Sequence, residues 1–205
     1  GAIGTETVTI TITGTNDAPV ITGGPATSAL TESDVALLDS GTLTVSDADL
    51  TDVVTASVDG VVVTGTGATS VPGTLTNGDL AGFLTVTPTA ILTGTDLGNT
   101  LTWNFNSGIE AFDFLADGET LVLTYTVSAT DDNGIAASDT ETVTVTITGS
   151  NDAPVITGGP ATSALTESDV GLSDTGTLTV GDADLTDVVT AAVYGVAVAG
   201  TGAAS

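Results

Sequence analysis

The 205-residue chain contains no Lys, Arg, His, Cys or Met, and its 26 Asp and Glu residues give a formal net charge of −26. The lack of Lys and Arg argues against binding to nucleic acid or to an anionic membrane surface, because phosphate groups need a cationic partner. The lack of Cys excludes disulfides and thiolate chemistry, whereas a hydrophobic content of 40% favours folded domains over a disordered acidic segment.

A long internal repeat divides the chain. Residues 149–159 copy residues 14–24 with one change, so the period is about 135 residues, the size of a whole domain. We expect residues 16–150 to form one complete domain. We expect residues 1–15 to be the C-terminal strand of a preceding repeat, and residues 151–205 to be the incomplete N-terminal part of a following one. A start without Met and a stop within a repeat indicate a fragment.

Apolar residues alternate with threonine along most of the complete repeat. Val143, Val145 and Ile147 are each separated by a threonine, the pattern of a strand with one buried and one solvent-facing side. Similar segments, bounded by Gly, Asp and Asn, predict strands near residues 18–22, 28–31, 41–46, 53–58, 61–65, 83–87, 100–106, 120–129 and 139–148. Many short strands in one domain predict an all-β fold, an immunoglobulin-like antiparallel β-sandwich.

Three local signals interrupt these strands. Asp59-Gly60 predicts a two-residue hairpin turn, because this pair accepts the positive φ of a type I′ turn. Residues 88–92 and residues 109–115 each predict a single helical turn.

The predicted core is drawn from the inward-facing apolar positions of the strands and of the second helical turn. It contains Leu43, Val45, Phe83, Leu84, Val86, Trp103, Phe105, Phe112, Leu121, Leu123, Tyr125, Val127, Val143, Val145 and Ile147. Trp103 and Tyr125 could also be interpreted as a sugar-stacking pair, but each shares its face with aliphatic neighbours, which favours the core. Residues 151–205 contain only the first strands of a repeat, so we expect them to close poorly on their own.

Acidic and amide side chains gather in four loops, at residues 16–17, 31–34, 46–52 and 130–134. Neighbouring carboxylates without Lys or Arg cannot all stay ionised unless a cation joins them. An all-oxygen ligand set suits Ca²⁺, whereas Zn²⁺ is disfavoured in a chain without His or Cys. The alternative is ordinary turn chemistry, in which Asp and Asn are simply common in turns.

An immunoglobulin-like strand order predicts which of these loops meet. One group of ligands is carried to the pole where the chain enters the domain, here called the incoming pole: Asn16, Asp17, Asp47, Asp49, Asp131 and Asp132. Glu32 falls at the opposite, outgoing pole. There it would face a second group: Asn151, Asp152, Asp182 and Asp184. Each joint would then collect calcium ligands from both of its domains.

Three stretches of the chain resemble one known family. GTLTVSDAD (41–49), ETLVLTYTVSATDDNG (119–134) and TETVTVTITGSNDAPVI (140–156) resemble the VCBS repeat, a cadherin-like domain of very large bacterial surface adhesins of the RTX type. The resemblance implies a β-sandwich, secretion to the cell surface and calcium at interdomain joints. By analogy with cadherin linkers, it implies ligand roles for Glu32, Asp47, Asp49, Asn151 and Asp152. The repeat is longer than is typical, with the excess expected in residues 53–82 and 92–98.

These observations favour a structural function. The chain is predicted to be an extender segment of a secreted adhesin, which projects an adhesive region from the bacterial cell surface while Ca²⁺ stiffens its joints. Its partners would be neighbouring repeats of the same chain, and a host or surface ligand would be contacted only through other domains. The alternative is a module that binds a glycan or a protein, which would need exposed aromatic residues on its loops.

Enzymatic activity is not expected from this composition. Without His, Cys and Lys there is no Ser-His triad, thiol nucleophile or Schiff base, and nothing in the sequence indicates the paired acids of a glycosidase within a cleft. The sequence also has no run of about 18 apolar residues, so direct insertion into a membrane is not expected.

Overall fold

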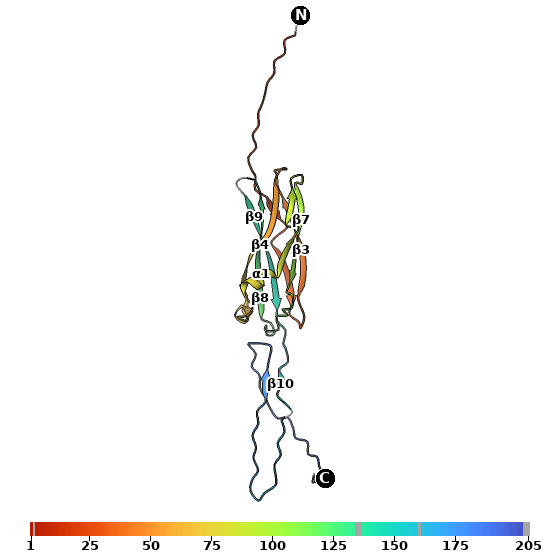
Figure 1. Ribbon diagram of the computed structural model, residues 1–205, viewed down its shortest axis with the longest axis vertical. Helices are drawn as coiled ribbons and strands as arrows, with labels where there is room; N and C mark the ends of the chain where they lie inside the picture. Colours follow the sequence, from red (N-terminus) through yellow and green to blue (C-terminus); the bar gives the residue numbers. More distant parts are fainter. Residues whose placement is uncertain (2, 134–136, 160, 203–205) are drawn as a thin grey trace.

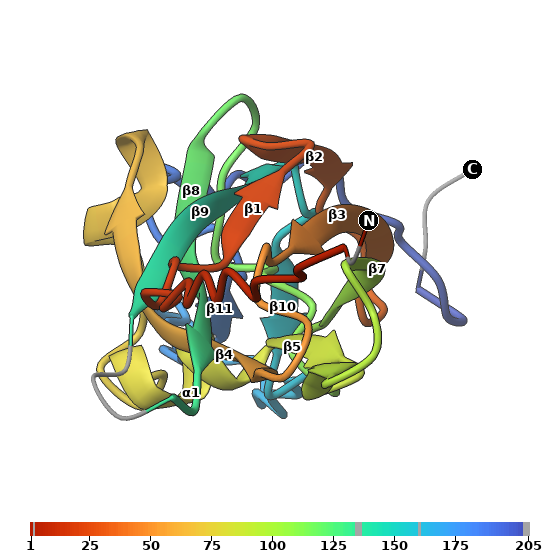
Figure 2. The same ribbon diagram turned by 90° about the horizontal axis from the view of Figure 1, so that it is seen from above.

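The computed structural model describes residues 1, 3–133, 137–159 and 161–202, so Gly134 of the predicted acidic loop lies outside the described residues. Two β-sheets pack face to face, seen from the side in Figure 1 and from one end in Figure 2. The four-stranded sheet contains, in spatial order, β1 (Val20–Thr22), β3 (Leu38–Ser46), β7 (Gly98–Asn106) and β5 (Leu84–Thr87). The five-stranded sheet contains β2 (Ala26–Thr31), β9 (Ser138–Thr148), β8 (Thr120–Asp131), β4 (Val53–Thr64) and β6 (Ala90–Thr93). The predicted all-β, immunoglobulin-like β-sandwich is confirmed.

One strand pair departs from the antiparallel pattern among the described residues. β2 and β9 run parallel, in a register from Ala26↔Val143 to Thr31↔Thr148. The cause is that the chain changes sheets early: β1 pairs with β3 in one sheet, and β2 then joins the edge of the other. The last strand of the domain therefore lies beside one of its first strands, which hydrophobic alternation alone does not reveal.

The core lies between the two sheets and follows the predicted alternation. Along β8, alternate side chains from Leu121 to Val127 are fully buried, and the side chains between them face outward. All the predicted core residues are buried except Phe83, which is partly buried and packs against the core. Trp103 and Tyr125 are therefore core residues and do not form a sugar-stacking pair.

Tyr125 brings a polar group into this core. Its hydroxyl donates to the carbonyl oxygen of Leu80 at 2.9 Å, and burial raises the pKa of Tyr125 far above its usual value. We expect Tyr125→Phe to lower the free energy of unfolding by about 1 kcal/mol, because it removes one hydrogen bond while keeping the ring. Urea titration measures the loss. Tyr194→Phe is the matched control, since Tyr194 is fully exposed. An equal loss in both variants would contradict the expectation.

The predicted hairpin at Asp59-Gly60 is wrong. β4 continues through these residues and pairs with β8 from Val54 to Thr64, with a β-bulge between Val58 and Gly60. The carboxylate of Asp59 accepts hydrogen bonds from the hydroxyls of Ser57 and Ser128, which hold the bulged residue in place. A bulge and a tight turn both suit Asp-Gly. The long partner strand β8 decides between them, because it offers pairing to both halves of β4.

The two predicted helical turns are also wrong. Residues 90–93 form β6, which pairs with β4 and buries Ile91 and Leu92. Residues 109–115 form an irregular loop, although Phe112 is buried as expected, and Leu115 is buried as well. In both places the tertiary packing of apolar side chains overrides a weak local helical pattern.

Two short helices lie instead in the connection between β4 and β5. They are the 3₁₀-helix η1 (Thr66–Thr69) and the α-helix α1 (Asn77–Gly82). α1 begins with a capping box between Thr76 and Asp79, and hydrogen bonds from Thr76 lower the pKa of the Asp79 carboxyl group. Among the described residues, no helix combines the length and the apolar character needed to span a membrane.

The segments on either side of the sandwich have little regular structure. Residues 1–18 are extended and exposed where described, and residues 151–202 contain the short strands β10 (Val155–Thr157) and β11 (Thr179–Gly181). The pairing Ile156↔Val180 repeats Ile21↔Val45 one period later. Ile156 is nevertheless 61% exposed, whereas Ile21 is 6% exposed and packs into the sandwich core.

Candidate metal centres

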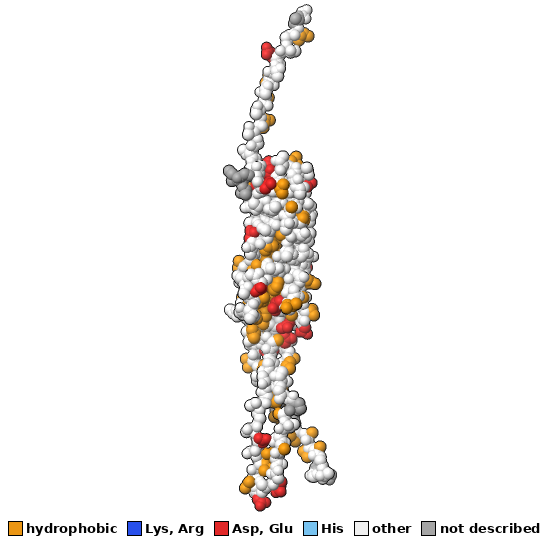
Figure 3. Space-filling view, viewed as in Figure 1, with side chains coloured by type: hydrophobic (Ala, Val, Ile, Leu, Met, Phe, Trp, Pro, Cys, Tyr) orange, Lys and Arg blue, Asp and Glu red, His pale blue; other side chains and the backbone are white. Residues whose placement is uncertain are grey.

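Carboxylates gather in two clusters, one at each pole of the sandwich. The outgoing cluster consists of Glu32, Asp113 and Asp152. The incoming cluster consists of Asp47, Asp49 and Asp52. Within each cluster, one carboxylate oxygen from every residue lies within 4.8 Å of the others. Figure 3 shows acidic side chains concentrated at both ends of the sandwich, with no Lys or Arg near them.

Glu32 is held at the outgoing pole by the end of β2. Its backbone N–H donates to the carbonyl oxygen of Thr148 at 2.8 Å, which extends the β2–β9 pairing by one residue. Its carboxylate oxygen Oε2 accepts hydrogen bonds from the backbone N–H and the hydroxyl of Ser150, both at 2.8 Å. Glu32 is only 3% exposed. The side chain is therefore fixed beside the segment that leaves the domain.

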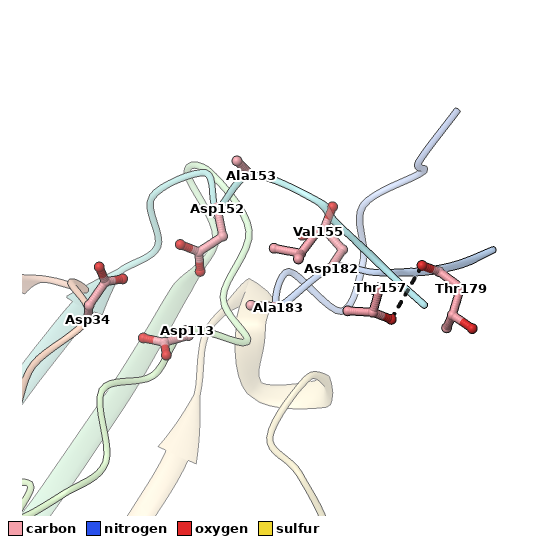
Figure 4. A pocket seen from close by; sticks show the side chains of 10 residues that line it. Asp34, Asp113, Asp152, Ala153, Val155, Thr157, Thr179, Asp182 and Ala183 are labelled. Carbon is pink, nitrogen blue, oxygen red and sulfur yellow. Dashed lines mark hydrogen bonds between the residues drawn. The ribbon is translucent and has the colours of Figure 1, made fainter. Parts of the chain in front are cut away.

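Asp113 reaches the same place from the loop between β7 and β8. Its neighbours Phe112 and Phe114 are both buried and pack against each other with ring centroids 6.0 Å apart. Phe112 has a positive φ of 69°, and its N–H donates to the Glu110 carboxylate. Figure 4 shows the carboxylates of Asp113, Asp34 and Asp152 around one opening. The two buried phenylalanines thus leave Asp113 between them directed towards the joint.

Asp152 belongs to the segment that leaves the sandwich after β9. Its N–H donates to Oδ2 of Asp184 at 2.8 Å, and the N–H of Asp184 donates to Oδ1 of Asp182 at 3.3 Å. The same two bonds occur one period earlier, where Asp17 binds Asp49 and Asp49 binds Asp47. The Asp-Ala-Asp loop of each repeat therefore receives the backbone of its own incoming segment.

The chain has no Lys or Arg side chain that could offset the charge of the carboxylates at the outgoing pole. Burial, followed by the nearby charges of Asp152, Asp34 and Glu110, raises the pKa of Asp113. Burial, followed by the charges of Glu32 and Asp184, raises the pKa of Asp152.

The incoming cluster has a similar construction. Asn16 donates through Nδ2 to Oδ2 of Asp131 at 2.9 Å, and this hydrogen bond lowers the pKa of Asp131. Asn133 donates through Nδ2 to Oδ1 of Asp52 at 3.1 Å. Burial raises the pKa of Asp52, and the charges of Asp49 and Asp47 raise it further.

The structure brings most of the predicted residues together at the predicted poles. Asn16, Asp17, Asp47, Asp49 and Asp131 meet at the incoming pole, and Glu32, Asp152, Asp182 and Asp184 meet at the outgoing one. Two further predicted residues form hydrogen bonds with backbone groups. Asp132 accepts from the N–H of Val53 at 2.9 Å, and Asn151 donates to the carbonyl oxygen of Asp152 at 2.7 Å. Ligand roles for the whole set stay predictions.

Three further acidic residues belong to these sites. Asp52 and Asp34 lie in loops that the sequence already marks as acidic, and the structure shows that the conformation of these loops brings both side chains to the sites. Asp113 carries no such signal, because it stands alone between two phenylalanines in a segment with a helical pattern.

Both clusters fit a hard divalent cation. Buried carboxylate oxygens without a hydrogen-bond partner are present at the outgoing pole, on Asp113, Asp152 and Asp184, and at the incoming pole, on Asp47 and Asp52. An unpartnered buried oxygen is unfavourable unless an ion or another group satisfies it. Carboxylate, amide and backbone oxygens are the ligands that Ca²⁺ takes in proteins.

No protein-family model and no curated protein matches this sequence. Among solved structures, the chain is similar to the PapD-like domain 7 of human CEP192, at 10% identity and a TM-score of 0.39 over 73% of this chain and 99% of that one. It is also similar to the CooA pilin subunit of enterotoxigenic Escherichia coli, at 12% identity and a TM-score of 0.42 over 65% and 99% of the two chains. Likenesses this remote say nothing about what the chain binds or does.

Proposed function

We propose that this chain is a stretch of extender repeats from a large secreted bacterial adhesin of the VCBS type, in which Ca²⁺ at the joints fixes each domain relative to the next. The outgoing cluster carries the proposal. Glu32 and Asp113 belong to the complete sandwich, Asp152 belongs to the segment that leads into the next repeat, and no Lys or Arg is available to neutralise them. A cation held by all three residues joins two domains.

The residues of the chain position the ligands. Ser150 holds the Glu32 carboxylate through two hydrogen bonds, and Asp184 holds the backbone of Asp152. Without a cation, the carboxylates of Glu32, Asp113 and Asp152 repel one another, which pushes the connecting segment away from the sandwich. Bound Ca²⁺ supplies the positive charge that offsets this repulsion.

The proposal includes a location outside the cell. Extracellular calcium modules typically bind with a Kd of about 10⁻⁴ to 10⁻³ M, which suits surroundings rich in calcium. A surface rich in Asp and Glu and a chain without Cys are compatible with a bacterial surface protein, and the sequence resemblance points to the same place.

Calcium is expected to stabilise and straighten the chain. Each occupied site adds about 2.7 kcal/mol to the free energy of unfolding when free calcium is 100 times the Kd. Thermal unfolding of the 205-residue chain in calcium and in EDTA measures the stabilisation, and small-angle X-ray scattering measures the longest dimension. Identical melting and scattering curves in the two buffers would contradict the proposal.

Two variants make this test specific. Asp152→Asn keeps the shape of the side chain but removes its charge from the outgoing cluster, so it is expected to weaken the calcium response. Asp169→Asn removes an exposed carboxylate that belongs to neither cluster, and it is expected to respond like the wild type.

The alternative function, a module that binds a glycan or a protein, has less support. Phe83 and the five buried aromatic residues all pack in the sandwich, and Tyr194 is the fully exposed aromatic side chain among the described residues. A glycan array probed with the chain tests this alternative directly.

A further inference from the structure

The parallel pair formed by β2 and β9 has a special place in the domain. β2 lies near the start of the domain and β9 is its last strand, and both run from the incoming to the outgoing pole because they are parallel. Figure 1 shows the chain entering the sandwich at one end and leaving it at the other. The two strands are thus connected to opposite ends of the molecule while lying side by side over six residues.

This arrangement determines how the pair responds to tension. Pulling the chain ends apart draws β2 towards the incoming pole and β9 towards the outgoing pole, so the strands must slide along each other. Every hydrogen bond between them is then loaded at the same time. Strands pulled apart from a common end instead open one hydrogen bond after another. The first arrangement resists a greater force, since several bonds must break together.

We propose that the β2–β9 pair is a mechanical clamp that protects the domain from unfolding under tension. The inference rests on the proposed function, because only a chain that spans a distance under load needs such a clamp. β1 is a weaker barrier on the same path, since it pairs with β3 over only three residues. Once β1 detaches, the load falls on β2.

Glu32 strengthens the clamp at its outgoing end. Its N–H continues the ladder to Thr148, and its buried carboxylate binds both the N–H and the hydroxyl of Ser150. Ser150 is the second residue after β9, where the load leaves the domain. The side chain of Glu32 therefore ties the end of β2 to the outgoing segment, beyond the last paired residues of the two strands.

The alternation of a parallel ladder identifies which amides to test. Because the N–H of Glu32 donates to β9, the amide of Ser28 also points towards β9, and the amide of Ala29 points towards the free edge of the sheet. Ser28→Pro removes a ladder donor. Ser28→Ala controls for the loss of the hydroxyl bond to Asp39, and Ala29→Pro controls for the presence of proline at an edge strand.

The test is single-molecule pulling of the full chain by its two ends in EDTA. Ser28→Pro is expected to raise the unfolding rate at constant force on the order of tenfold relative to Ser28→Ala, the factor that accompanies the loss of about one hydrogen bond. Ala29→Pro is expected to unfold like the wild type. Equal unfolding rates for Ser28→Pro and Ser28→Ala would overturn the clamp.

A second measurement does not depend on any proline variant. The chain has no cysteine, so a handle attached through Val35→Cys is unique, and Val35 is 65% exposed in the loop between β2 and β3. Pulling between this handle and the C-terminal end leaves β2 outside the loaded segment, and we expect a lower unfolding force than between the two ends. Equal forces in the two geometries would overturn the clamp. A missing calcium effect would refute only the proposed joint, since both pulling comparisons are made in EDTA.

Discussion

Replacing Gly149 with alanine is expected to destabilise the complete domain and to weaken calcium binding at its outgoing pole. A Cβ atom at this position would lie 2.3 Å from the carbonyl oxygens of both Leu115 and Ala116. These obstacles are backbone atoms, so the loop itself must move. Overpacking of this kind lowers the free energy of unfolding by about 1–3 kcal/mol, and we expect the upper part of that range because no flexible side chain can give way.

The same substitution is expected to disturb the outgoing cluster, because Gly149 is connected to it in two ways. Gly149 exchanges backbone hydrogen bonds with the turn at Gly118 and Glu119, and it directly precedes Ser150, which holds Glu32. Asp113 lies in the loop that must shift. Both sides of the outgoing cluster therefore move when Gly149 acquires a side chain. Urea unfolding measures the loss of stability, and calorimetric titration measures the loss of calcium affinity.

The repeat supplies a closely matched control for this experiment. Gly14 occupies the equivalent place one period earlier, followed by nearly the same sequence, but no atom lies within 4 Å of a Cβ built on it. Gly14→Ala is expected to leave the denaturation midpoint unchanged. A similar loss in both variants would show that the contact with Leu115 and Ala116 is not the cause of the destabilisation, because the effect of alanine on the unfolded chain raises stability.

The sequence predicts those parts of this fold that depend on a regular pattern. β8 and β9 alternate large apolar residues with residues that are mostly threonine, and both form as predicted, with Leu121–Val127 and Val143–Ile147 fully buried on their inner faces. The sequence also predicts at which pole Glu32 and Asp47 lie, because strand order alone decides at which end of the domain a loop lies. Alternation does not report which strands become neighbours, so it misses the parallel contact of β2 with β9.

Features decided by long-range packing escape the same reasoning. Asp59-Gly60 suits a turn locally, but the length of β8 makes it a bulge. Asp113 joins the outgoing cluster because two buried phenylalanines on either side of it fix the loop, and neither the spacing nor the charge pattern of the sequence records that contact. The sequence therefore predicted at which end of the domain the site lies and that carboxylates form it, but it did not predict every residue that takes part.

Acidification is expected to stabilise the metal-free chain. The pKa values of Asp113 and Asp152 are raised above the ordinary value of 3.8, by burial first and by neighbouring carboxylates second. Above their pKa values both are ionised in the folded and the unfolded chain, and only the folded chain brings the charges together. As the pH falls towards 3.8, the folded chain takes up protons first, so the free energy of unfolding rises.

Groups with the opposite shift do not cancel this effect in the same pH range. The pKa values of Asp79 and Asp131 are lowered by hydrogen bonds from Thr76 and Asn16, so the stability they contribute is lost only as the pH falls below 3.8. Urea titrations in EDTA at pH 7 and at about pH 5 isolate the raised groups, since the ordinary pKa of Asp and Glu lies below that window.

Two further measurements, on a variant without the charges and in the presence of calcium, distinguish carboxylate repulsion from a general effect of acid on stability. The double variant Asp113→Asn/Asp152→Asn is expected to be more stable than the wild type in EDTA at pH 7, and to gain less from acidification, because the repulsion is already gone. In saturating calcium the trend of the wild type is expected to reverse, since protons then compete with the metal for the same oxygens. A wild-type chain that loses stability between pH 7 and pH 5 in EDTA would show that carboxylate repulsion does not limit the metal-free joint.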